Sequence, residues 1–253
     1  MIGRALTAAK WIALGFGHKG LVLDLGSGNS PHPRADVLCD RHLTPTGHRH
    51  AKLVKDRSLV CADISALPFR DKVFSFVICR MVLEHIDPAQ LPSALLELSR
   101  VASAGYIETP SPICELLMPD PCHTTFVELD ADTLVFTPKA QSVPFPAVAY
   151  TLGRWRRELK VWQQFISNHQ SLLSVRLSWT GSIAYRISTP ASVPSSFSAD
   201  TSDVLELFNN DDASFVDRSL RSVLKALVRR AFHAGGPRIH FRQSTSSTVR
   251  SDS

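Results

Sequence analysis

The sequence predicts an α/β fold: a doubly wound, mainly parallel sheet of seven strands whose last strand is antiparallel. Three observations support this. Short apolar stretches alternate with helical patterns along the chain. An apolar run over residues 21–25 ends in a glycine turn, and a second tight turn at Thr180-Gly181 joins two late strands, which must therefore be antiparallel. With 253 residues, 44% hydrophobic, the chain can bury one sizeable core.

Five strands are expected before the middle of the chain. They cover residues 21–25, 35–39, 59–62, 73–79 and 105–108. Pro31 and Pro33 fall in the short connection between the first two strands. Because proline removes a backbone donor and restrains its neighbour, no helix is expected in that connection.

Helices are expected at three places in the first 190 residues. The clearest covers 88–101, where Pro88 suits a first helical turn and leucines recur at helical spacing. The mildly apolar residues 5–16 are expected to form a helix packed on the domain rather than a signal peptide. Lys10 interrupts the apolar run, and no clean cleavage site of small residues is present. A further amphipathic helix is expected over 153–168.

A proline-rich insertion is expected over residues 110–150, within a domain that spans 1–190. Inside it, 126–129 and 133–136 predict a small hairpin. Ligands of open α/β sheets bind beyond the carboxyl ends of the strands, where this insertion begins, so it is interpreted as a cap on the substrate side. The closing hairpin of the main sheet is expected from strands 172–179 and 183–188.

Residues 191–253 predict a serine-rich linker, a basic amphipathic helix over 213–234 and a disordered tail. The basic helix has several interpretations: it docks on its own domain or frays in solvent, it contacts an anionic membrane surface, or it fits a partner groove. Nucleic acid is not expected as a partner, because no aromatic residues are interleaved with the basic ones.

The turn Gly26-Ser27-Gly28 indicates a nucleoside-bearing cofactor, because glycines let backbone amides approach a ligand closely. An oxidoreductase that binds NAD would show a third glycine, and Pro31 stands at that position instead. A Tyr-x-x-x-Lys catalytic pair is also lacking. The NAD-linked oxidoreductase is therefore the weaker alternative.

Three motifs in order resemble those of the class I S-adenosylmethionine-dependent methyltransferases, in particular the small-molecule type 11-like group. They are Asp24-Leu25-Gly26-Ser27-Gly28, Ala62-Asp63-Ile64-Ser65-Ala66-Leu67-Pro68-Phe69 and Leu83-Glu84-His85-Ile86. The resemblance implies a Rossmann-like sheet, S-adenosylmethionine as cofactor, and methyl transfer to a small-molecule, glycan-linked or lipid-linked acceptor. The alternative is a non-catalytic module of the same fold that serves as an interaction platform.

The resemblance implies a set of cofactor-binding residues. They are Asp24, Gly26, Ser27, Gly28, Asp40, Arg41, Ala62, Asp63, Ile64, Arg80, Met81, Val82 and Glu84. A carboxylate can accept both ribose hydroxyls, and Asp40 ends the second strand, although a solvated turn acid is its alternative. The resemblance puts Asp63 near the adenine amino group. Asp24 either orders the glycine loop or reaches the cofactor's ammonium group.

Methyl transfer depends mainly on alignment of the reacting atoms, so a general base is optional. The candidates are His85, Glu108 and His123, each with a structural role as its alternative. No metal site is expected: His42, His48 and His50 are interpreted as a solvated loop, and Cys114 and Cys122 lack a second close pair. Five cysteines without a C-x-x-C pair indicate a reducing, cytoplasmic location, with peripheral membrane contact through the basic helix as an alternative.

Overall fold

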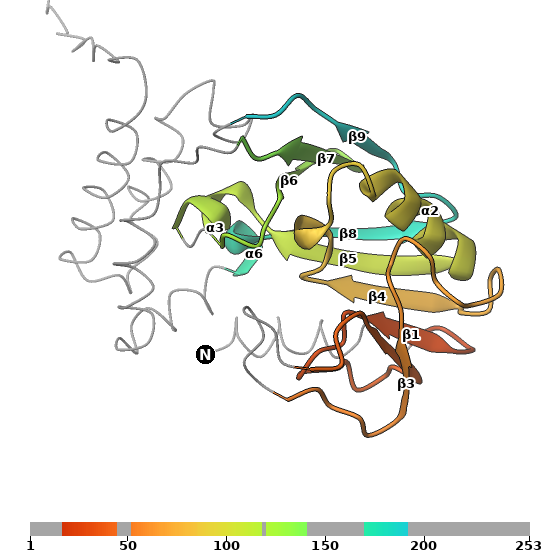
Figure 1. Cartoon of the computed structure of the whole chain (residues 1–253). Coiled ribbons are helices and arrows are strands. Elements are labelled where there is room, and N and C mark those ends of the chain that lie inside the picture. Colours follow the sequence, from red (N-terminus) through yellow and green to blue (C-terminus); the bar gives the residue numbers. More distant parts are fainter. Residues whose placement is uncertain (1–16, 45–51, 118–119, 141–169, 192–253) are drawn as a thin grey trace, which may run out of the picture.

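The computed structural model describes residues 17–44, 52–117, 120–140 and 170–191. Its main sheet has the strand order β3-β2-β1-β4-β5-β8 (Figure 1). The strands are β1 (Val22–Leu25), β2 (Val37–Asp40), β3 (Ser58–Cys61), β4 (Phe76–Arg80), β5 (Ala104–Pro110) and β8 (Ser174–Thr180). The first five pair in parallel and β8 is antiparallel to β5. The predicted Rossmann-like α/β fold with an antiparallel edge strand is confirmed.

The connections of the sheet contain few helices within the described residues. They are α2 (Leu91–Val101), α3 (Pro112–Leu117), α6 (Gln170–Leu173) and a 3-10 turn, η1 (Leu83–His85). The helix α2 begins three residues after the predicted start, because the Asp87 side chain accepts the Ala89 amide at 2.8 Å and holds a turn there. Leu91, Leu95 and Leu98 of α2 are buried, as their helical spacing requires, whereas Leu96 on the other face is exposed.

The connection between β1 and β2 has no helix, as its prolines predict. Polar contacts hold it instead. The Arg57 guanidinium donates to the carbonyls of His32 at 3.1 Å and Ala35 at 2.9 Å. His32 is fully buried beneath them. Side-chain hydrogen bonds therefore fix this loop, which leads from the glycine turn to the second strand.

A second sheet has the order β6-β7-β9, with β6 (Thr125–Asp130), β7 (Thr133–Pro138) and β9 (Tyr185–Ile187). The antiparallel pair β6–β7 confirms the small hairpin predicted from 126–129 and 133–136. The predicted antiparallel pairing of 172–179 with 183–188 is wrong, because β9 pairs in parallel with β7. The main sheet consequently has six described strands rather than seven.

The reason for this difference lies in the short link after β8. Gly181 adopts a φ of +75° and turns the chain away from the main sheet. Ile183 is then buried in the main core, and the Leu134 amide donates to the Ala184 carbonyl at 2.9 Å. The strand β9, which was expected to pair with β8, thus pairs with the open edge of β7.

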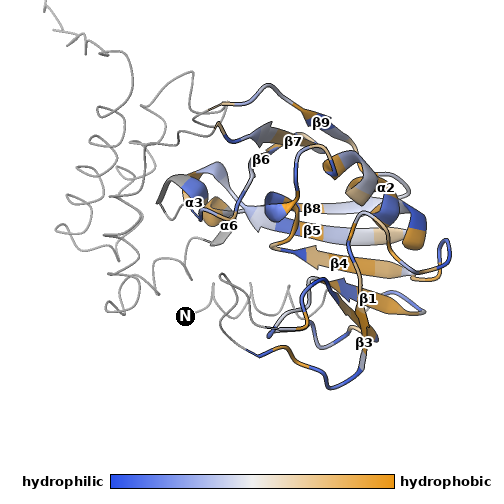
Figure 2. Ribbon diagram, viewed as in Figure 1, coloured by the Kyte–Doolittle hydropathy of each residue, from blue (hydrophilic) through white to orange (hydrophobic). Residues whose placement is uncertain are grey.

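The core lies on both faces of the main sheet, and its apolar strands stand out in Figure 2. One face packs against α2 and the second sheet, so that Leu95, Val127 and Phe136 belong to one buried cluster. The other face holds a smaller cluster that includes Val22, Ile78 and Tyr106. The second sheet therefore covers part of this face together with α2.

Three predicted helices, over 5–16, 153–168 and 213–234, lie outside the described residues. None of the helices in the described ranges has both the length and the apolar character that a membrane crossing requires.

Candidate functional site

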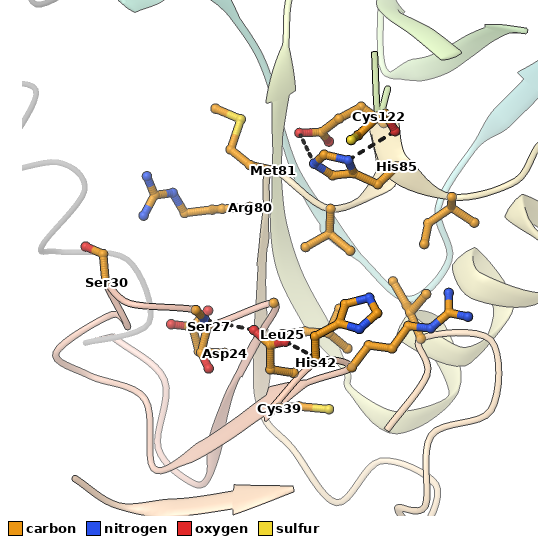
Figure 3. Close-up of a pocket in the computed structure, with 18 of the residues that line it drawn as sticks. Asp24, Leu25, Ser27, Ser30, Cys39, His42, Arg80, Met81, His85 and Cys122 are labelled. Carbon is orange, nitrogen blue, oxygen red and sulfur yellow. Dashed lines mark hydrogen bonds and ion pairs between the residues drawn. The ribbon is translucent and has the colours of Figure 1, made fainter. Parts of the chain in front are cut away.

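A cavity of about 590 Å³ opens at the carboxyl ends of β1, β2 and β4 (Figure 3). This is the edge at which open α/β sheets bind their ligands. Most of the residues predicted for the site line it. They are Asp24, Gly26, Ser27, Gly28, Asp40, Arg41, Ala62, Ile64, Arg80, Met81, Val82, Glu84, His85 and His123. The chain thus brings together residues from the ends of β1, β2 and β4, from the connections after the first four strands, and from the segment before β6.

The glycine turn forms the floor of the cavity. Gly26 and Gly28 have φ values of +71° and +53°, which favour glycine, and the Gly26 amide donates to the Cys39 carbonyl at 2.8 Å. A Cβ atom added at Gly26 would lie 2.2 Å from Val82 Cγ2. Between the glycines, the Ser27 hydroxyl is buried and has no hydrogen-bond partner among the described residues. The turn therefore presents close backbone and one unsatisfied hydroxyl to a ligand.

Asp40 ends β2 and lies at the side of the cavity. Its carboxylate accepts the Gly28 amide at 3.1 Å and the His42 amide at 2.8 Å. One acid therefore ties together the loops after β1 and β2. It remains at the strand end where a ribose diol was expected to bind.

Asp24 is buried beneath the glycine turn and accepts the His32 amide at 2.6 Å. This contact is the loop-ordering role, one of the two alternatives for this residue. Burial raises the pKa of Asp24 to about 6, against opposing contributions from the His32 amide and from Arg80 and Arg57.

Two predicted site residues do not line the cavity. Asp63 accepts the Ser65 amide at 2.9 Å and its hydroxyl at 2.7 Å, and pairs with Arg41 at 3.2 Å. The Ser65 amide is the main reason why the pKa of Asp63 is lowered. Its neighbours in sequence, Ala62 and Ile64, line the cavity in its place.

Glu108 is the second residue outside the lining. Its buried carboxylate lies between two guanidinium groups, 3.1 Å from Arg80 Nε and 3.0 Å from Arg176 Nε. Arg80 itself lines the cavity. Glu108 therefore does not contact the cavity itself, but it pairs with Arg80, which does. Arg176 had no signal in the sequence, because it lies 68 residues away on β8.

The far wall of the cavity comes from η1 and the segment before β6. The rings of His85 and His123 meet edge to face, with centroids 4.5 Å apart. The Cys122 carbonyl lies 3.3 Å from His85 Nδ1, as the dashed line in Figure 3 shows. Glu84 is buried beside them, and burial raises its pKa to about 8.

A buried polar group behind this wall orients His123. His123 Nδ1 is hydrogen-bonded to Glu115 of α3, and Lys139 Nζ holds the other Glu115 oxygen at 2.6 Å. Glu115 and Lys139 were missed in the sequence, because nothing in their local patterns links two positions 24 residues apart. His42 lines the cavity from an exposed position, whereas His48 and His50 lie outside the described residues. All five cysteines are free thiols.

These features fit an adenosyl cofactor. An acid at the end of the second strand, a side-chain-free turn after the first, and a buried hydroxyl without a described partner between them are features that suit a nucleoside cofactor in an α/β domain. Residues 23–107 match the family model of a methyltransferase domain. The matched segment holds the three motifs whose resemblance to class I methyltransferases the sequence shows.

Several solved structures can be aligned with parts of this chain. The PH0226 protein from Pyrococcus horikoshii OT3 is 20% identical over 60% of this chain and 79% of its own, with a TM-score of 0.37. An S-adenosylmethionine-dependent methyltransferase from Clostridium acetobutylicum ATCC 824 is 17% identical over 51% of this chain and 57% of its own, with a TM-score of 0.34. A chain from the complex between the Haloferax volcanii Trm112 methyltransferase activator and the putative methyltransferase is 13% identical over 70% of this chain and 89% of its own, with a TM-score of 0.41. No curated protein matches the chain.

Proposed function

We propose that the chain transfers a methyl group from S-adenosylmethionine to a small-molecule, glycan-linked or lipid-linked acceptor that enters the same cavity. The observation that carries this proposal is the composition of the cavity wall. One side holds the glycine turn and Asp40, and the other holds His85 and His123. A cofactor half and an acceptor half can therefore share one cavity.

On the cofactor side, the residues are suited to a charged nucleoside. When bound, S-adenosylmethionine supplies a methyl group already activated on a sulfonium. Asp40 offers carboxylate oxygens toward a ribose diol, and Ala62 and Ile64 offer apolar surface beside a base ring. Met81 and Val82 then border the region between cofactor and acceptor.

On the acceptor side, the wall favours a polar nucleophile such as a hydroxyl or an amine. The Glu115 carboxylate fixes the His123 ring through Nδ1, so Nε2 is the atom suited to accept the proton that the acceptor releases. Glu108 faces two arginines instead, and we assign it the positioning of Arg80.

The test is calorimetric titration of the full chain with S-adenosylmethionine and S-adenosylhomocysteine, with NAD as the matched control ligand. We expect micromolar affinity for both adenosyl ligands and none for NAD. Incubation with a labelled methyl donor and fractionated cell extract then identifies the acceptor class by the label it gains. If neither adenosyl ligand binds at millimolar concentration, the non-catalytic module is the correct interpretation.

A further inference from the structure

Glu84 carries two buried carboxylate oxygens that have no hydrogen-bond partner among the described residues. The side chain is 1% exposed. A buried carboxyl group without a partner loses its hydration and receives nothing in exchange. The position of Glu84 therefore indicates a partner that the described residues do not supply.

Two histidines surround this carboxylate. Glu84, His85 and His123 each offer a ligand atom, and the three atoms lie within 4.8 Å of one another. His85 Nε2 is 4.0 Å from Glu84 Oε1. The three residues line the large cavity, so a group held between them would face its interior.

Both histidines are held by oxygen atoms through Nδ1. The Cys122 carbonyl holds His85, and the Glu115 carboxylate holds His123 while Lys139 holds Glu115. Histidines that bind metals in proteins show this outer contact, because it fixes the tautomer and directs the Nε2 lone pair at the ion. Both rings therefore have the Nδ1 contact that accompanies metal ligation through Nε2.

We infer that Glu84, His85 and His123 bind one divalent transition-metal ion in the wall of the cavity. Two imidazoles and one carboxylate suit Mn²⁺, Fe²⁺, Co²⁺ or Zn²⁺, whereas Mg²⁺ and Ca²⁺ prefer ligand sets of oxygen alone. Three protein ligands leave coordination positions open toward the cavity.

The open coordination positions of the ion suit an acceptor that offers an oxygen atom as a ligand. This role of the ion in binding the acceptor rests on the proposed function. An acceptor hydroxyl bound to the ion would lose its proton to water more readily, since a divalent ion lowers the pKa of an oxygen that it binds. The acceptor oxygen then forms a bond to the methyl carbon as the carbon–sulfur bond breaks. The electron pair of the broken bond stays on sulfur. With the ion bound, His85 and His123 would both serve as ligands, and the proton would go to water. His123 Nε2 could accept the proton, as proposed above, only in the metal-free chain.

The test measures metal binding by the full chain after removal of metal with EDTA and exchange into metal-free buffer. Titration with Mn²⁺ is the main probe, because Cys61 and Cys122 are exposed thiols that bind Zn²⁺ more readily. We expect one ion per chain. Glu84→Gln and His123→Asn should each weaken binding about 100-fold or more, and Glu115→Gln about 10- to 100-fold. Absorption bands of bound Co²⁺ should disappear in the same variants.

Glu128→Gln is the matched control, since Glu128 lies on β6 and does not line the cavity. Its Mn²⁺ affinity should equal that of the unaltered chain. Glu84→Gln keeps the size of the side chain, and thermal melting followed by circular dichroism verifies that each variant is folded. Absence of Mn²⁺ binding, or binding that Glu84→Gln and His123→Asn leave unchanged, overturns the metal site.

Titration with S-adenosylmethionine in the presence of EDTA separates the two proposals. Cofactor binding without any metal binding overturns the metal site and leaves the methyl-transfer proposal standing. Metal binding without cofactor binding supports the metal site and contradicts methyl transfer.

Discussion

Asp40 Oδ2 accepts a hydrogen bond from the Gly28 amide at 3.1 Å, and this contact joins the ends of two neighbouring strands. The other oxygen of Asp40 accepts the His42 amide at 2.8 Å. A single acid therefore sets the positions of both loops on the cofactor side of the cavity. The charged carboxylate of Asp40 thus holds the two loops in place and is also the group proposed to contact ribose.

We expect Asp40→Asn to weaken binding of S-adenosylmethionine about 10- to 100-fold, because hydrogen bonds to a charged group contribute about 1.5–3 kcal/mol. Calorimetric titration measures the change. Asp130→Asn is the control, since Asp130 pairs with Arg186 at 2.8 Å on an exposed part of the second sheet. An affinity that Asp40→Asn leaves unchanged would show that this carboxylate does not face the cofactor.

Gly26→Ala should destabilise the fold more than Gly181→Ala. Both glycines have positive φ, +71° and +75°, so both variants lose about 1–2 kcal/mol from backbone strain. Only at Gly26 does the added Cβ meet a neighbour, 2.2 Å from Val82 Cγ2, and overpacking costs about 1–3 kcal/mol more. Urea denaturation measures both. Equal losses would mean that Val82 moves aside freely.

Asp24 should make stability depend on pH. Burial raises its pKa to about 6 from an ordinary value of 3.8, so the folded chain keeps a proton that the unfolded chain has lost. The stabilisation from this group is complete below about pH 4 and is lost as the pH rises through about 6. Arg80 and Arg57 limit the shift and Asp40 adds to it.

We therefore expect Asp24→Asn to reduce the loss of unfolding free energy between about pH 4 and pH 7 by up to about 3 kcal/mol. Urea titrations across this range measure the difference. Asp132→Asn serves as the control, because Asp132 is exposed in the turn between β6 and β7. If the two variants show the same pH profile, Asp24 is ionised in the folded chain throughout.

Glu108→Gln should act on stability. The variant leaves Arg80 and Arg176 without their shared carboxylate, and both guanidinium side chains are about one third exposed, at 31% and 32%. We expect a loss of about 1–2 kcal/mol, because water screens the arginines. Urea denaturation and the pH profile of methyl transfer are the two measurements. A profile that loses its acidic limb while stability stays constant would identify Glu108 as a base.

The strands of the main sheet could be predicted because their apolar runs are short and regularly punctuated. The absence of a helix between β1 and β2 followed from Pro31 and Pro33. The pairing of β9 could not be predicted in this way. Alternation over 183–188 indicates a strand, but two open edges were within its reach, and the burial of Ile183 favoured β7 over β8.

The cofactor side of the cavity was also accessible to sequence reasoning, since its residues lie in motifs beside strand ends. The far wall was not. His123 reaches His85 only because the insertion folds back on η1, where the Thr124 amide donates to the Glu84 carbonyl at 2.7 Å. Glu115, Lys139 and Arg176 form long-range ion pairs, and no local pattern marks such partners.

The parallel pairing of Leu134 with Tyr185 has a consequence for biosynthesis. A ribosome delivers β6 and β7 well before β9, so the hairpin waits with one edge open while some fifty residues emerge. Closure of that edge is a late event in folding, and a chain interrupted before residue 185 lacks the strand that completes it. Nascent chains arrested at that point should therefore be recognised by chaperones that bind unpaired strand edges.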